Sequence, residues 1–287
     1  MKYQRVSDNF VYPEIKPELH IFGYTPFTGT PLREDGDWRD YLPPEEDQNK
    51  RGVESSACYI EAQQHTIATI EEESLEEIDN NYSARFNALL SGGTPQGGDP
   101  LKGADSIRND GLIPDSAMPF GDNITSFDEF HSWKGVVKSI LIKTGQNYLT
   151  KKKINYQIVF KREESIDAKY AKIRQALKYS PLPVSVCGWF QERDLYVKPK
   201  GMRDNHLVEL VYVDAEGHPY IRDTYPPYQK KLEPFYDFDF GMVLTVAKRP
   251  DNEQIKLSVF DTLKQYGLLA FFADFLDRFT RSIGIKK

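Results

Sequence analysis

The stretch ESSACYIEAQQ, residues 54–64, joins a run of small residues to a segment that we predict to be a helix. From Cys58 onward the apolar residues recur at helical spacing, and no glycine or proline interrupts them before the acidic run at 71–73. Ser55 and Ser56 are suitable N-cap residues for such a helix. Cys58 therefore stands where the helix is predicted to begin, and its position raises the question of its role.

Two roles are open for Cys58. A free cysteine is most often a small, buried apolar residue. The alternative is a nucleophile, because a helix N-terminus and a neighbouring imidazolium both stabilise a thiolate. The small residues before Cys58 would also leave backbone N–H groups accessible to the oxyanion of a substrate. Distant residues have to decide between the two roles.

His206 and Asp223 are the distant residues that favour a nucleophile. His206 stands just before the apolar run Leu207–Val213, which predicts a strand, and Asp223 ends the next predicted strand, 219–222. Neighbouring antiparallel strands can place two such residues side by side. A nucleophile and its base need a third group that orients the imidazole. The pattern therefore predicts one site that contains Cys58, His206 and Asp223.

The predicted elements change in character along the chain. Helices are expected at 58–73, 81–90, 101–109 and 168–179, with a further helix near 132–142, and strands at 154–160, 183–190, 207–213, 219–222 and 242–246. The first half is thus mainly helical and the second half mainly β. Segregation of this kind predicts an α+β fold.

Taken in order along the chain, these motifs resemble those of the papain-like cysteine peptidases. The local signature of that family is C-G-[SA]-C-[WY], with the histidine about 130–150 residues downstream. Here residues 55–59 read SSACY, and His206 lies 148 residues after Cys58. Further similarities occur in family order, at Asp37-Trp38-Arg39, Asp47-Gln48, Gly97-Gly98, Ala104, Gly111, Ala117–Phe120, Leu182–Val186 and Asn205–Val208.

The resemblance implies a papain-like fold of two lobes. A helical lobe, about 50–150, would carry the cysteine helix, and a β-barrel-like lobe, about 151–250, would carry the histidine. Residues 37–250 would form the catalytic domain, preceded by an extended N-terminal arm at 1–36.

The resemblance also implies the roles of four residues. Cys58 would be the nucleophile, His206 the general base and acid, and Asp223 the residue that orients the imidazole. Gln48 would donate to the oxyanion together with the backbone N–H of Cys58. Two departures stand out: Gln48 precedes Cys58 by 10 residues, a longer interval than is usual in the family, and 223–225 reads DTY in place of N-S-W. A longer loop can bulge and still deliver the amide, and an aspartate can orient an imidazole as an asparagine does.

The last segment, 251–287, carries a broad apolar stripe and is predicted to be an amphipathic helix. Packing on its own domain, docking to a protein partner and self-association are all open. The stripe has too few lysines and arginines for a typical binder of anionic lipid. The longest wholly apolar run there, 268–273, is far too short to span a membrane.

Composition and residue spacing exclude several classes of function. The net charge of −6 and the pI of about 5.5 lack the basic excess of a nucleic-acid binder. No histidine or cysteine pair has metal-ligand spacing, and no glycine pattern predicts a phosphate site, so we expect neither metal nor cofactor. Two cysteines do not make a disulfide framework, and residues 1–20 lack the apolar core of a secretory signal. We expect the cytoplasm, or a host cytoplasm or virion if the source is a phage.

Two functions follow. The first is a cysteine peptidase or related amide hydrolase that acts on a peptide or protein through a Cys-His-Asp triad and a thioester intermediate. The alternative is a papain-like fold used as a structural or assembly module, for example a virion component, with weak or no hydrolytic activity.

Overall fold

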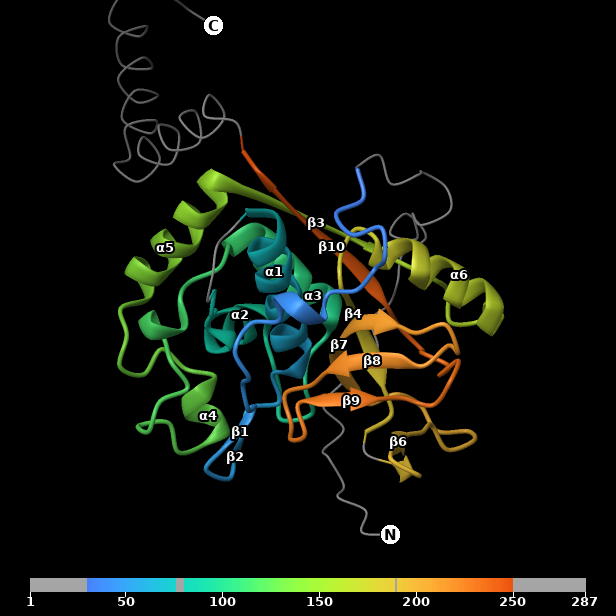
Figure 1. Cartoon of the computed structure of the whole chain (residues 1–287). Coiled ribbons are helices and arrows are strands. Elements are labelled where there is room, and N and C mark those ends of the chain that lie inside the picture. Colours follow the sequence, from blue (N-terminus) through green and yellow to red (C-terminus); the bar gives the residue numbers. More distant parts are fainter. Residues whose placement is uncertain (1–29, 76–79, 189, 250–287) are drawn as a thin grey trace, which may run out of the picture.

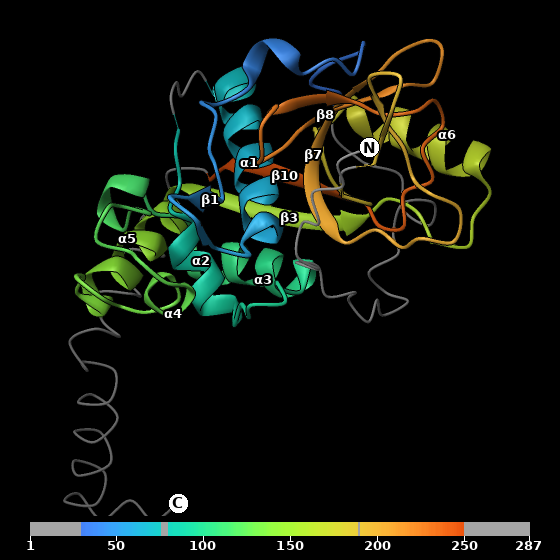
Figure 2. The same cartoon turned by 90° about the horizontal axis from the view of Figure 1, so that it is seen from below.

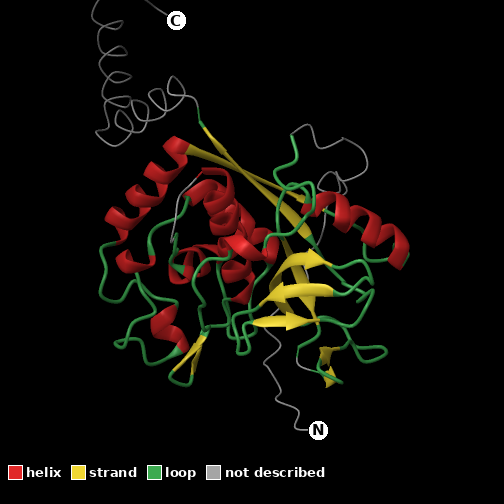
Figure 3. Cartoon of the chain, viewed as in Figure 1, coloured by secondary structure: helices red, strands yellow, loops and turns green. Residues whose placement is uncertain are grey.

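Most of the helices lie on one side of the molecule and the four-stranded sheet lies on the other (Figures 1 and 3). The structure is a computed structural model and describes residues 30–75, 80–188 and 190–249. The predicted C-terminal helix, and all of the predicted N-terminal arm except 30–36, lie outside the described residues. No helix in the described ranges combines the length and apolar character needed to cross a membrane.

The helical side contains α1 (Cys58–Leu75), α2 (Ala84–Ser91), α3 (Pro100–Asp110), α4 (Phe127–Phe130) and α5 (Lys138–Lys151), with a short 3-10 helix at Asp115–Ala117. A second 3-10 helix, Arg39–Tyr41, lies against the sheet, where Arg39 contacts the rings of Tyr212 and Tyr220. The strands are β1 (Asn49–Lys50), β2 (Val53–Glu54), β3 (Lys152–Ile158), β4 (Leu182–Val186), β5 (Gln191–Glu192), β6 (Leu195–Tyr196), β7 (His206–Val213), β8 (Pro219–Arg222), β9 (Gln229–Lys231) and β10 (Met242–Lys248). One helix, α6 (Ile166–Leu177), packs on the strand side.

The β lobe is an open sheet beside a two-stranded ribbon. β4, β7, β8 and β9 form an antiparallel sheet in that order, and β3 pairs with β10 along its whole length. An isolated bridge from Val184 to Gly241 links the ribbon to the sheet. The described strands do not close on themselves, so the expected barrel-like lobe is corrected to an open sheet. The short strand β9 is the last of the four, and the chain directly after it bridges to β6 between Leu232 and Tyr196.

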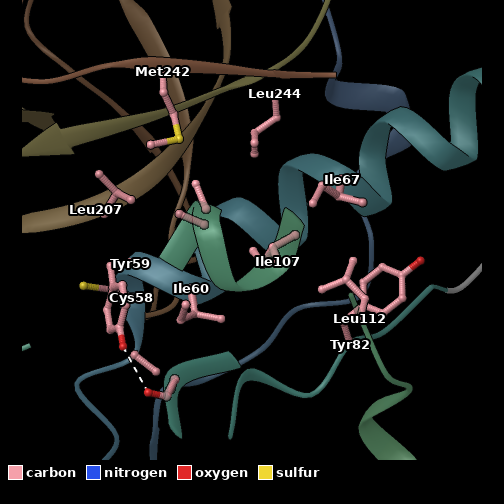
Figure 4. Packing of buried hydrophobic residues seen from close by; sticks show 14 of the residues in the cluster. Cys58, Tyr59, Ile60, Ile67, Tyr82, Ile107, Leu112, Leu207, Met242 and Leu244 are labelled. Carbon is pink, nitrogen blue, oxygen red and sulfur yellow. Dashed lines mark hydrogen bonds between the residues drawn. The ribbon is translucent and has the colours of Figure 1, made fainter. Parts of the chain in front are cut away.

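Helix α1 runs through the centre of the molecule, between the lobes (Figures 1 and 2). From Cys58 to Glu71 its residues are buried on every side, including Ile60, Ile67 and the polar Gln63. The Gln63 amide donates to Tyr59 O over 2.6 Å and to Pro100 O over 2.9 Å, so its burial leaves no amide hydrogen without an acceptor. Figure 4 shows α1 packed against residues of α3, β7 and β10, labelled Ile107, Leu207, Met242 and Leu244.

Most predicted helix boundaries are confirmed within a few residues, and side-chain caps explain where α2 and α3 begin. Ser83 Oγ accepts from Phe86 N, and Asp99 accepts from Leu101 N ahead of Pro100. The helix expected near 132–142 was placed too early, because Gly135, with a φ of +76°, forms a turn before α5 begins at Lys138. The short helix α4 was not predicted.

Candidate active site

Cys58 is the first residue of α1. Ile60 N and Glu61 N both donate to Ala57 O, so the helical hydrogen bonds begin one residue earlier. Ser55 Oγ accepts from Ala57 N over 3.3 Å. In Figure 4 the sulfur of Cys58 lies at the end of the helix and points away from Ile60 and Ile107. The thiol is buried, but it faces outward from the packed interior of the helical lobe.

Ser56, two residues before Cys58, has a φ of +53°. This left-handed conformation costs about 1–2 kcal/mol for a residue with a Cβ. The papain-like signature has a glycine at this position. Two hydrogen bonds hold Ser56 in place: its N donates to Glu54 Oε1 over 2.9 Å, and its Oγ donates to Pro95 O over 3.1 Å.

His206 and Asp223 meet at the ends of two neighbouring strands. His206 opens β7, opposite Val186 of β4, and Asp223 directly follows β8. Nε2 of His206 lies 2.9 Å from Oδ1 of Asp223, and both side chains are fully buried. The sequence prediction that strand pairing brings these two residues together agrees with this geometry.

The imidazole of His206 also contacts Cys58. Burial alone lowers the pKa of His206, but the charges of Asp223 and of a Cys58 thiolate, with a hydrogen bond to each, raise that pKa to about 10. Because Nε2 is directed at Asp223, the other ring nitrogen, Nδ1, is the one available to the sulfur. The three predicted residues therefore form one connected group.

Lys230 is a fourth member of this group, and the sequence did not suggest it. It lies on β9 opposite Ile221 of β8, and its Nζ donates to Asp223 Oδ2 over 2.6 Å. Burial raises the pKa of Asp223, but His206 and then Lys230 outweigh it, so the net direction is downward. Burial lowers the pKa of Lys230 to about 8 despite the attraction of Asp223. No sequence signal marks Lys230, because β9 is only three residues long in a polar segment.

Gln48 stays beside the cysteine segment despite the long interval between them. The intervening residues form the hairpin β1–β2, whose turn residues Arg51 and Gly52 have φ values of 55° and 78°. Two positive φ values are characteristic of a type I′ turn. Ser55 N donates to Gln48 O over 3.0 Å and closes the hairpin. The additional residues between Gln48 and Cys58 thus form a hairpin, which leaves Gln48 and Ser55 hydrogen-bonded to each other.

Both hydrogens of the Gln48 amide are already donated within the chain. Nε2 donates to Glu54 Oε1 over 2.7 Å and to the hydroxyl of Tyr225 over 2.6 Å, while Oε1 accepts from Thr224 over 2.6 Å. The Tyr225 hydroxyl in turn donates to Glu54 Oε2 over 2.5 Å. Glu54 thus accepts a hydrogen bond from the amide that was predicted to bind a substrate oxyanion, and no motif in the sequence predicts this contact.

Tyr225 lies over the histidine. The two ring centroids are 5.4 Å apart, as expected for a residue that shields the His206–Asp223 pair. Burial, and then the neighbouring Glu54 carboxylate, raise the pKa of the Tyr225 hydroxyl well above its usual range, so it acts as a neutral donor.

A cavity of about 280 Å³ opens beside the hairpin and Ser56. Its lining residues are Gly52, Val53, Glu54, Ser56, Pro95, Thr125, Ser126 and Phe127.

The second cysteine, Cys187, follows β4, and burial raises its pKa to about 11. In the described part of the chain, no three histidine, cysteine or acidic side chains are grouped to hold a metal ion.

Solved structures with the same fold are papain-like cysteine proteases. Xylellain, a cysteine protease from Xylella fastidiosa, is 18% identical, with a TM-score of 0.55, and the match covers 85% of this chain and 98% of that one. A procathepsin B from Trypanosoma congolense is 13% identical over 83% of this chain and 82% of its own, with a TM-score of 0.50. A stem bromelain precursor is 16% identical over 75% and 70%, with a TM-score of 0.50.

At the level of sequence, no protein-family model and no curated protein matches this chain. The similarity is therefore one of fold, and the roles of individual residues rest on the geometry of this site.

Proposed function

We propose that this chain, which has a papain-like fold, is a cysteine peptidase or a related amide hydrolase that acts through Cys58, His206 and Asp223. The observation that carries the proposal is the contact of His206 with Cys58 on one side and with Asp223, over 2.9 Å, on the other. A nucleophile, a base and an orienting group in that order are the parts that acyl transfer requires.

In the first half of the reaction, the thiolate of Cys58 attacks the carbonyl carbon of the substrate and a C–S bond forms. The imidazolium of His206 then donates its proton to the leaving amine, and the C–N bond breaks. The product is a thioester on Cys58 and a neutral His206.

In the second half, neutral His206 takes a proton from water as the water oxygen attacks the thioester carbon. The C–S bond breaks, the acid is released, and the thiolate and imidazolium are restored. Asp223 stays ionised throughout and holds the ring in the orientation that both steps use.

The oxyanion of each tetrahedral intermediate would be stabilised by the Cys58 N–H and the Gln48 amide. Because Gln48 already donates to Glu54, the substrate oxygen has to replace Glu54 as the acceptor. The cavity beside Ser56 is the adjoining space in which a substrate side chain can lie.

The test is to trap the acyl-enzyme. The full chain is incubated with an activated ester of an N-blocked amino acid, the reaction is quenched with acid, and the mass of the protein is measured by mass spectrometry. In a parallel reaction, the full chain is incubated with a broad peptide library and cleavage of the peptides is measured. We expect one acyl group on Cys58, none in Cys58→Ala, and an unchanged result in the matched variant Cys187→Ala. Acylation of neither cysteine, with no peptide cleaved, contradicts the proposal.

The second candidate function is a papain-like module without hydrolytic activity. Two observations favour it: Cys58 and His206 have no exposed surface, and the Gln48 amide already donates to Glu54. Under this alternative, Cys58→Ala changes neither a measurable reaction nor the state of assembly.

A further inference from the structure

We propose that Lys230 is a positioning residue that neutralises Asp223, so that the buried Asp223–Lys230 pair serves His206 as a neutral asparagine would. The inference rests on the proposed function for its effect on catalysis. Its electrostatic part concerns only the folded protein and can be measured without any substrate.

The contacts around Asp223 divide its two carboxylate oxygens between different partners. Oδ1 faces His206 Nε2 at 2.9 Å and accepts from Tyr225 N over 3.1 Å. Oδ2 accepts from Lys230 Nζ over 2.6 Å. Lys230 Nζ also donates to Tyr225 O over 2.9 Å, so it is fixed by the same short segment that carries the acid. The carboxylate can neither rotate nor move without losing one of these bonds.

The backbone places the lysine with little freedom. Lys230 of β9 is paired with Ile221 of β8, and Ile221 is two residues before Asp223 in the sequence. On its other side, Nζ lies 5.4 Å from the centroid of the Tyr196 ring. The side chains of Lys230, Asp223 and His206 have no exposed surface, so solvent does not screen the charges they carry.

The charges of the group cancel in pairs. A thiolate on Cys58 and an imidazolium on His206 form one neutral pair, and Asp223 with Lys230 forms the second. An aspartate without Lys230 would add an uncompensated negative charge beside the imidazolium and hold its proton more tightly. Proton donation to the leaving amine would then become harder. With Lys230 present, the imidazolium is oriented by a carboxylate but is not overstabilised by it.

The other ionisable groups near this pair are fixed in number and are the same in every variant considered below. Among the described residues they are Cys58, Glu61 and His65 in α1, Glu54 in β2, Tyr196 in β6 and the Tyr225 hydroxyl. Changes in the titration of His206 between variants therefore report on Asp223 and Lys230.

The experiment measures the titration of the His206 imidazole by NMR in the full chain labelled with ¹⁵N-histidine. The signal is assigned by its loss in His206→Gln. Three variants are compared with the parent: Lys230→Met, Asp223→Asn and the double variant with both changes. Lys231→Met is the matched control, since it removes the adjacent lysine, whose partner is Asp214 at 3.3 Å.

In the parent we expect the His206 signal to move twice, first near pH 8 as Lys230 loses its proton and then near pH 10 as the imidazolium loses its own. Lys230→Met and the double variant should lack the step near pH 8, and Lys231→Met should keep it. Asp223→Asn should lower the imidazolium midpoint by about one pH unit or more, because the carboxylate that faces the ring is gone. In hydrolysis, Lys230→Met should lose about tenfold in kcat with little change in KM, and the double variant should recover most of that loss.

A single step in the parent, or a step near pH 8 that persists in Lys230→Met, overturns the inference, because that step is assigned to the lysine. The double variant carries the same test if Lys230→Met does not fold. If the steps appear as expected but no variant, including the parent, hydrolyses any substrate, the role of Lys230 stands and the proposed function fails. If the parent is active and the step near pH 8 is absent, only the role of Lys230 fails.

Discussion

Nε2 of Gln48 donates a hydrogen bond to Oε1 of Glu54 over 2.7 Å, so the amide proposed for the substrate oxyanion is held by a carboxylate of the same chain. The same Oε1 atom accepts from Ser56 N over 2.9 Å. A carboxylate oxygen between an amide and a backbone N–H, close to the nucleophile, resembles the anion that such donors would stabilise. Glu54 and a substrate oxygen therefore compete for Gln48.

This competition predicts that Glu54→Ala raises kcat. With Glu54 removed, Gln48 keeps one amide hydrogen free for the oxyanion, and we expect a gain of about tenfold, a fraction of what a whole oxyanion donor contributes. Steady-state hydrolysis of a fixed peptide measures it, with the exposed Glu45→Ala as control. A fall in kcat in Glu54→Ala alone would mean that Glu54 supports the site.

Removing the donor itself should have the opposite effect. Gln48→Ala is expected to lower kcat by about 10²-fold or more at nearly constant KM, because the lost interaction is made mainly in the transition state. Gln48 also accepts from Thr224 over 2.6 Å, so thermal unfolding has to show that the fold survives. Additive effects in the Gln48→Ala, Glu54→Ala double variant would argue against competition for a shared donor.

The pH dependence follows from His206. Its pKa is lowered by burial but raised, on balance, to about 10 by Asp223 and the Cys58 thiolate. The imidazolium that protonates the leaving amine therefore persists through neutral pH. Apart from the roughly tenfold decrease expected as Lys230 loses its proton near pH 8, kcat/KM should fall only as the pH approaches about 10. A pH–rate profile on a neutral substrate checks this, and an alkaline limb near pH 7 would contradict it.

The same shift has a consequence for stability. Since the folded-state pKa lies above the unfolded value of about 6.5, the protonated His206 stabilises the fold fully below pH 6.5, and this contribution is lost as the pH rises through about 10. His206→Gln should therefore unfold at lower urea than the parent at pH 7, and the difference should shrink toward pH 10. If the difference in urea stability between His206→Gln and the parent does not change with pH, the loss of packing around the ring explains it and the charge of His206 does not.

The central helix predicts a stability effect at Ile67. This residue is fully buried in the cluster that joins α1 to α3, β7 and β10, so Ile67→Ala should lower the free energy of unfolding by about 2–5 kcal/mol. Ile140→Ala on α5, where the side chain is 61% exposed, is the control and should change it by less than about 0.5 kcal/mol. Urea denaturation at pH 7 measures both.

The parts of the site that the sequence predicted are those that depend on local pattern. The uninterrupted helical spacing after Cys58 marks α1, and the apolar run after His206 marks β7, so both positions follow from neighbouring residues. The order of the papain-like motifs then places Asp223 and Gln48. The fold class follows from the same segregation of helices and strands.

The contacts of the site that could not be predicted from the sequence depend on pairing between strands. Lys230 reaches Asp223 only because β9 pairs with β8 in one register, and a three-residue polar strand carries no periodic signal. Glu54 reaches Gln48 because the turn at Arg51–Gly52 folds β2 back on β1. In each case the partner is set by a backbone register that no spacing in the sequence encodes.

Whether Cys58 is an activated nucleophile is tested by the rate at which iodoacetamide alkylates the two cysteines of the native protein at pH 7, measured by peptide mapping. Cys187 provides an internal reference, because burial raises its pKa to about 11. We expect Cys58 to react at least about tenfold faster than Cys187, and His206→Gln to abolish the difference. Slow alkylation of both cysteines at the same rate, unchanged by His206→Gln, would contradict the assignment of Cys58 as a nucleophile activated by His206.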